Sequence, residues 1–210
     1  MNDATTTEPR WPGVVAVGAV VVLNLFLPSS LSAEPGWYAV LAVALLKIAG
    51  LALPRVHARF GYAAAAIATA VLGRALFLLV ADLEAHRGKP ADLLLGALVI
   101  WSMNILVFAS WYWRLDAGGP HGRAKHEVYC GGAFLFPQLS LPAETKRLIG
   151  AEDWRPRFID YLFVAFNAST AFSPTDVPVL STWAKVLMMI QSSISLATLA
   201  VVAARAVNIL

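Results

Sequence analysis

Long apolar runs, separated by short polar or proline-containing breaks, dominate the chain. Each run approaches the roughly 20 apolar residues needed to cross about 30 Å of hydrocarbon, so each predicts a membrane-spanning helix. The five runs cover 14–27, 37–53, 62–81, 93–113 and 183–209. Their ends fit this interpretation: Pro28 follows the first run, Pro54 follows the second, and Trp111-Tyr112-Trp113 closes the fourth like an aromatic belt at the membrane interface.

A shorter apolar segment, 158–169, has a different character. It contains Asp160 and Asn167, so it is too short and too polar for a lipid-facing span, yet its aromatic residues recur at roughly helical spacing. The non-helical Ser173-Pro174-Thr175 that follows is tolerated at membrane depth only inside protein or beside a water-filled cavity. We therefore expect an all-α membrane protein with about five transmembrane helices and a short re-entrant helix and loop.

Composition supports this class. The chain has 210 residues, of which 59% are hydrophobic and 14% charged, whereas soluble domains have about a quarter of their residues charged. Its mean hydropathy is +0.67. We expect a multi-pass protein of the cell membrane, with the lipid bilayer as its surroundings. The 16 Lys and Arg barely exceed the 13 Asp and Glu, and no basic patch is interleaved with aromatic residues, so nucleic-acid binding is not indicated.

The long polar loop, 115–157, offers little chemistry. Cys130 is the single cysteine and has no second thiol or histidine at a metal-ligand spacing. His121 and His126 lack a carboxylate partner at a defined spacing, which is typical of solvated side chains. No nucleophile, base and third group recur at one membrane face, and Ser173 with the loop histidines does not form a triad. We expect no metal, no cofactor and no enzyme activity.

One segment resembles a known functional motif. In the pore module of potassium-channel-like proteins, a Phe and three further residues precede Thr-Thr-Val-Gly-Tyr-Gly-Asp, followed by a proline and a basic residue. Here Phe166 precedes the matching segment, and Pro178 and Lys185 follow it at compatible distances. The segment consists of Thr170, Ala171, Phe172, Ser173, Pro174, Thr175 and Asp176. The resemblance implies that the last helix is an inner, pore-lining helix and that the protein is a homo-oligomer, by this resemblance a tetramer.

The second half of the chain also resembles a family of uncharacterised bacterial membrane proteins with a degenerate version of this loop. That likeness includes 111–119 and the ending 206–210. Together the two resemblances divide the chain into an N-terminal three-helix region, 1–92, and a channel-like pore module, 93–210.

The loop departs from the channel pattern at its central positions. Ser173 and Thr175 stand where the filter has glycines, and Pro174 stands where it has tyrosine. Glycine permits a positive φ that is costly for Ser and Thr, so the ring of carbonyls that replaces the hydration shell of potassium is not expected to form. The resemblance then implies a weakly selective path for small cations, lined by hydroxyls and by Asp176. The alternative is a non-conducting structural or partner-binding protein that retains the fold, because Ser-Pro-Thr-Asp is also a good turn and helix start.

Polar residues recur on one face of the last run, at Gln191, Ser195 and Thr198. Such a stripe either lines water or forms hydrogen bonds to a neighbouring helix, and the second role is the commoner one.

Three basic residues, Lys47, Arg74 and Arg205, lie within or near the predicted spans. Arg205 is close enough to a helix end to reach the interface, and Lys47 is one to two turns from Arg55. Arg74 is nearer mid-span, with Asp82 two turns further on, so it is the one expected to be buried and paired.

The number of crossings stays open at five or six. If 158–175 re-enters, the chain crosses five times and the basic loop 114–157 lies outside when the C-terminus is inside. The positive-inside rule prefers that loop in the cytoplasm, which requires 158–175 to cross as a short sixth span. The resemblance favours re-entry.

Overall fold

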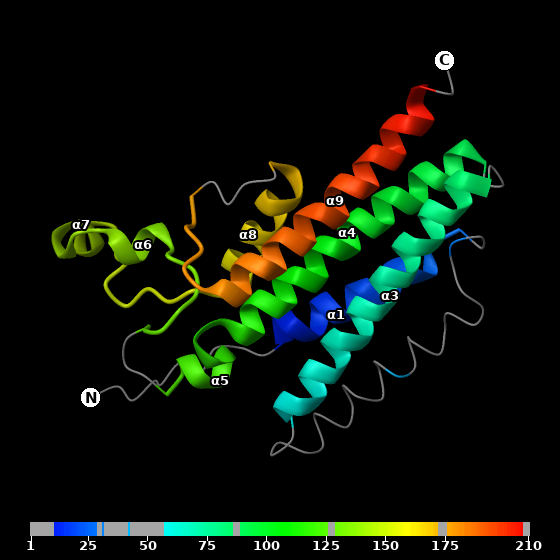
Figure 1. Ribbon diagram of the computed structural model, residues 1–210. Helices are drawn as coiled ribbons and strands as arrows, with labels where there is room; N and C mark the ends of the chain where they lie inside the picture. The colour runs from blue at the N-terminus through cyan, green and yellow to red at the C-terminus, as the bar shows by residue number, and fades with distance from the viewer. Residues whose placement is uncertain are drawn as a thin grey trace.

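The computed structural model describes residues 11–28, 31, 42, 57–85, 89–125, 129–171 and 176–207. The described part of the chain is mainly helical (Figure 1). Two extended segments meet in an isolated antiparallel bridge between Phe134 and Val179. The elements are α1 (Trp11–Leu25), α3 (His57–Ala85), α4 (Pro90–Leu115), a 3-10 turn η1 (Asp116–Gly118), α5 (Gly119–Arg123), α6 (Pro137–Ser140), α7 (Ala143–Leu148), α8 (Phe158–Thr170) and α9 (Thr182–Val207).

Three of these helices are long and apolar enough to cross a membrane. The stretches concerned are Arg59–Asp82 in α3, Ala91–Arg123 beginning in α4, and Thr182–Ala204 in α9. Helices of sufficient length and apolar content therefore occur at three of the five predicted spans, which indicates a membrane protein. The first predicted span, 14–27, forms the shorter apolar helix α1 of 15 residues. The predicted span 37–53, with Lys47, lies outside the described residues apart from Ala42.

Helix α4 is the centre of the packing. It contacts α1, α3, α8 and α9, so its apolar residues are buried around most of its circumference. Glycines allow two close approaches in this core, one between α1 and α4 and one between α4 and Leu31, which follows α1. A side chain at Gly13 in α1 would come within 2.4 Å of the Trp113 ring, and one at Gly96 in α4 would come within 2.2 Å of Leu31. The N-terminal helices and the second half of the chain therefore share one continuous core.

Both ends of α4 follow from the local sequence. Pro90 occupies the first turn, where its missing N–H costs nothing, and Asp92 adds a negative charge that suits the N-terminus. At the other end Ala117 adopts φ 48° and Gly118 φ 76°, left-handed conformations that the α-helix cannot continue through. The chain turns sharply here and starts the short helix α5.

Helix α8 lies against α4 and α9. Near its start, the Phe158 ring meets the Trp113 ring edge-on at a centroid distance of 5.8 Å. Near its end, the Ser169 carbonyl accepts a hydrogen bond of 3.4 Å from Trp101 Nε1. Beyond the loop, Leu180 N donates to Ala133 O at 2.8 Å.

The expected burial of Arg74 is wrong. Its side chain is exposed on α3, while Asp82 is half-buried and its Oδ2 has no hydrogen-bond partner among the described residues. Eight residues of α-helix span about 12 Å, which is too far for these two side chains to meet. The Arg205 side chain lies outside the described residues.

Candidate functional site

The predicted filter-like loop is described only at its two ends. Thr170, Ala171 and Asp176 are exposed, and Phe172, Ser173, Pro174 and Thr175 lie outside the described residues. The Thr170 hydroxyl turns back onto its own helix, with its Oγ1 2.9 Å from Phe166 O and 3.4 Å from Asn167 O.

The polar face of α9 is buried within the chain. Gln191 and Ser195 are 0% exposed and Thr198 is 1% exposed. Gln191 Nε2 donates to Ala165 O at 2.6 Å and to Ser169 Oγ at 2.8 Å, both in α8. These bonds join the middle of α9 to the second half of α8.

The same glutamine also binds α4. Its Oε1 accepts a 2.6 Å hydrogen bond from the Tyr112 hydroxyl. Asn104 Nδ2 donates to Gln191 O at 3.1 Å and to Ser195 Oγ at 2.9 Å. We call these five residues, Tyr112, Asn104, Gln191, Ser195 and Ser169, the glutamine network. In the single chain Gln191 and Ser195 form hydrogen bonds to neighbouring helices, which is the commoner of the two roles considered from the sequence. All three predicted residues, Gln191, Ser195 and Thr198, are buried.

A second buried polar cluster surrounds Asp116, directly after α4. Asp116 is 0% exposed. Its Oδ2 accepts hydrogen bonds of 2.5 Å from both the Tyr129 and Tyr161 hydroxyls, and its Oδ1 accepts one of 2.5 Å from the Ala133 backbone N–H. Three donors thus satisfy the buried carboxylate, as burial of a charge requires.

A buried arginine completes this cluster. Arg123 Nη1 donates to the carbonyls of Trp113 at 3.0 Å and Asp116 at 2.9 Å. The guanidinium carbon lies 5.2 Å from the centre of the Tyr161 ring, within the range of a cation–π contact. We call Asp116, Arg123, Tyr129, Ala133 and Tyr161 the aspartate cluster. This cluster connects the long loop to the C-terminal end of α4 and to the N-terminal part of α8.

Burial and the neighbouring Asp116 carboxylate raise the pKa of the Tyr129 phenol. The phenol consequently keeps its proton at neutral pH and acts as a donor to the carboxylate. No local sequence pattern predicts this cluster, because the two tyrosines are separated from Asp116 by 13 and 45 residues.

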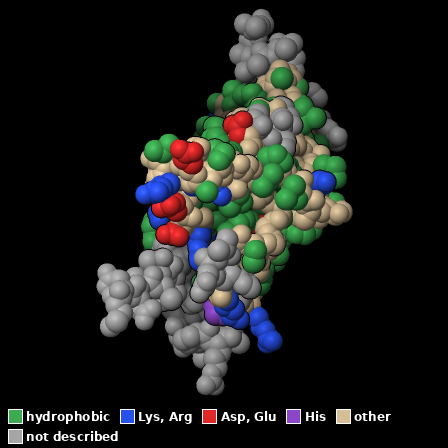
Figure 2. Space-filling view, turned by 90° about the vertical axis from the view of Figure 1, so that its left-hand side faces the viewer, with side chains coloured by type: hydrophobic (Ala, Val, Ile, Leu, Met, Phe, Trp, Pro, Cys, Tyr) green, Lys and Arg blue, Asp and Glu red, His purple; other side chains and the backbone are tan. Residues whose placement is uncertain are grey.

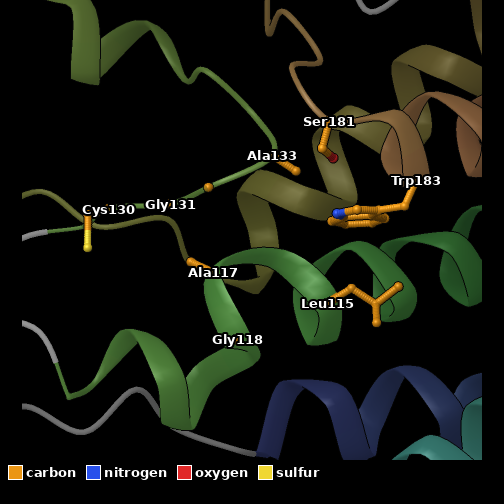
Figure 3. A pocket seen from close by; sticks show the side chains of 9 residues that line it. Leu115, Ala117, Gly118, Cys130, Gly131, Ala133, Ser181 and Trp183 are labelled. Carbon is orange, nitrogen blue, oxygen red and sulfur yellow. The ribbon is translucent and has the colours of Figure 1, made fainter.

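A half-open pocket of about 340 Å³ lies beside the aspartate cluster (Figure 3). The end of α4 contributes Leu115, and η1 contributes Ala117 and Gly118. The start of α9 contributes Trp183, with Ser181 just before it. The loop segment from Cys130 to Ala133 forms the remaining wall. The Ser181 Oγ is buried and has no hydrogen-bond partner among the described residues. None of these lining residues is charged.

Among the described residues, no group of three or more His, Cys, Asp or Glu side chains could hold a metal ion. His121 and Cys130 are both exposed, while His126 lies outside the described residues. The two buried clusters consist of groups that already bind one another, so their arrangement is suited to holding helices and loop in fixed positions.

Comparisons with protein-family models, with curated proteins and with solved structures found no match to this chain.

Proposed function

We propose that α4, α8 and α9 form a pore-loop module in the cell membrane, with α8 as the re-entrant helix and α9 as the inner helix. Several copies, four by the resemblance noted above, surround a path that passes small cations with weak selectivity. The proposal is carried by one observation, the depth to which α8 extends along α4.

The two ends of α8 lie at different levels of α4. Phe158 contacts Trp113 in the last turn of α4, whereas Ser169 contacts Trp101, near the middle of that 26-residue helix. Thirteen residues of α-helix measure about 20 Å, well short of the roughly 30 Å of hydrocarbon. Such a helix, lying against two long helices, fits a segment that enters the membrane partway.

The chain beyond the loop supports re-entry. The bridge between Phe134 and Val179 and the hydrogen bond from Leu135 N to Pro178 O at 2.9 Å hold the return segment against the long loop. That loop is itself fastened to the end of α4, where Ala133 N bonds to Asp116. Both flanks of the α8 segment therefore lie at the same end of α4, which favours five crossings over six.

The end of α8 is electrically suited to cations. The C-terminus of a helix carries a partial negative charge of about half an electron, and α8 ends at Thr170 beside the loop. Asp176 is exposed at the other end of the loop and adds a full negative charge in each subunit. Without glycines at positions 173 and 175, a ring of carbonyls that replaces the hydration shell is not expected, so the path is weakly selective.

Cation flux into liposomes containing the purified protein tests this function. We expect sodium and potassium to enter at comparable rates, and Asp176→Asn and Thr170→Val to reduce both rates. Asp153→Asn is the matched control, because Asp153 is also exposed but lies in the long loop before α8. Unchanged flux in both loop variants would refute the assignment of these residues, and absence of flux in the unmodified protein would refute the function.

A second candidate is a non-conducting structural or partner-binding protein that retains the same fold. The burial of Gln191, Ser195 and Thr198 favours it, because the polar face of α9 is occupied within the chain. The exposed face of α9 is mainly apolar, with Val186, Met189, Ile190, Leu196 and Leu199. Sedimentation in mild detergent separates the two candidates: a monomer favours this second one, and a defined oligomer favours the pore.

A further inference from the structure

A basic side chain lies at the crossing of α3 and α4, apart from both polar clusters. Arg114 belongs to the last turn of α4, and its guanidinium packs against Gly61 in α3. A side chain at Gly61 would come within 2.1 Å of Arg114 Nη1. The absence of a side chain at position 61 therefore creates the space that the guanidinium occupies.

The charge of Arg114 has no anionic partner among the described residues. Its Nε is buried without a hydrogen-bond partner, and the guanidinium carbon lies 5.5 Å from the centre of the Trp113 ring. The nearby Tyr62 hydroxyl donates to the Arg114 backbone carbonyl at 3.1 Å and is a neutral group, so it brings no negative charge to the guanidinium. A partly buried and unpaired cation is costly, and an anion that reaches its remaining nitrogens reduces that cost.

Two aromatic side chains, Tyr62 and Trp111, lie near Arg114 at the α3–α4 crossing. The Tyr62 and Trp111 rings lie 6.2 Å apart, and Trp111 Nε1 donates to Thr69 Oγ1 at 2.8 Å. Aromatic side chains of this kind gather where hydrocarbon meets headgroups. Arg59, two residues before Gly61 on α3, is exposed and adds a second positive charge. The acid closest in sequence, Asp116, is already bound by three donors.

We propose that Arg114, supported by Arg59, binds the phosphate of an anionic phospholipid at the α3–α4 crossing. A guanidinium offers two parallel N–H donors that match two phosphate oxygens, and the aromatic side chains beside it contact the glycerol and upper acyl region. The bound lipid supplies the negative charge that the described part of the chain does not.

Native mass spectrometry of the protein with phosphatidylglycerol, and separately with phosphatidylcholine, tests the site. We expect phosphatidylglycerol to be retained preferentially, and Arg114→Gln to weaken its retention by about tenfold, as expected for loss of a hydrogen bond between charged groups. The matched control is Arg147→Gln, which removes the same charge from an exposed residue of α7. It should leave retention unchanged.

A second variant guards against misfolding of Arg114→Gln. Gly61→Ala keeps both arginines but displaces the guanidinium, so it should also weaken retention of phosphatidylglycerol. Equal retention in the unmodified protein and both site variants would overturn the proposal. Binding of inorganic phosphate that depends on Arg114 and competes with phosphatidylglycerol would also overturn it, because the ligand would then be soluble phosphate.

Discussion

The glutamine network and the aspartate cluster both join α4 to α8, but through different chemical groups. Both include side chains that are 0% exposed. The glutamine network lies along the middle of α9 and contains only amides and hydroxyls, whereas the aspartate cluster lies beyond the end of α4 and contains a carboxylate and a guanidinium. Ionised groups cost more in hydrocarbon than neutral ones, so the charged cluster is found near the helix end.

The difference extends to what each cluster holds in place. The glutamine network joins three helices that also pack through apolar residues. The aspartate cluster holds a loop that includes exposed apolar residues, Leu148 at 81% and Ile149 at 60% exposure. Figure 2 views the molecule from the side on which α6 and α7 lie in Figure 1. Acidic and basic side chains are interspersed with hydrophobic ones on this face. The loop is held both by the polar bonds of the aspartate cluster and by Phe134 and Phe136, which are buried in the apolar core.

The largest expected effect is the loss of the buried carboxylate. Asp116→Ala leaves two tyrosine hydroxyls and the Ala133 N–H without their acceptor, so we expect the free energy of unfolding to fall by about 3–5 kcal/mol. Thermal unfolding in detergent measures the change. Asp153→Ala, at an exposed acid in the same loop, should have almost no effect. Equal effects of the two substitutions would contradict the role assigned to the cluster.

High pH should weaken the aspartate cluster. The Tyr129 phenol has a pKa raised above its ordinary value of 10.0, so the unfolded chain releases this proton first as the pH rises. The stability that Tyr129 contributes is complete below pH 10 and is lost progressively above it. Unfolding curves from pH 8 to 11 should show this decline, and Tyr129→Phe should make it shallower. An identical slope in the variant would refute the assignment.

A smaller effect is expected from the glutamine network. Gln191→Leu keeps a similar side-chain volume but removes the bonds to Tyr112, Ala165 and Ser169. Hydrogen bonds between membrane helices contribute about 0.6 kcal/mol each on average, so we expect a loss of about 1–2 kcal/mol. The comparison between the two clusters fails if this substitution destabilises the protein more than Asp116→Ala does.

The smallest effect is expected at Thr198. Its Oγ1 donates to Ile194 O of its own helix at 2.8 Å, so it does not join α9 to another helix. Thr198→Val should change the free energy of unfolding by less than about 0.5 kcal/mol. A much larger loss, measured in the same thermal assay, would mean that Thr198 has a partner outside the chain, such as a second subunit.

The helices of the second half could be predicted because each carries its signal locally. The predicted short segment 158–169 corresponds to α8 at Phe158–Thr170, and the predicted spans 93–113 and 183–209 correspond to α4 and α9. Length and apolar content alone decide such segments. The aspartate cluster has no local signal of this kind. Two donors to Asp116, Tyr129 and Ala133, come from the long loop and the third, Tyr161, comes from α8, so only tertiary packing brings them together.

The same reasoning explains the outcome for the polar residues of α9. Their helical spacing correctly placed Gln191, Ser195 and Thr198 on one face. Whether that face meets water or another helix depends on the partners Asn104, Tyr112 and Ser169, which the pattern within α9 does not contain.

The re-entry of α8 is the central claim, and accessibility on its two sides tests it most directly. In a Cys130→Ser background, Glu152→Cys places a thiol before α8 and Leu180→Cys places one after the loop, both at exposed positions. A membrane-impermeant maleimide is applied to intact cells and to inverted vesicles. Re-entry predicts that both thiols are labelled from the same side of the membrane. Labelling of the two thiols from opposite sides would contradict it and would make α8 part of a sixth crossing.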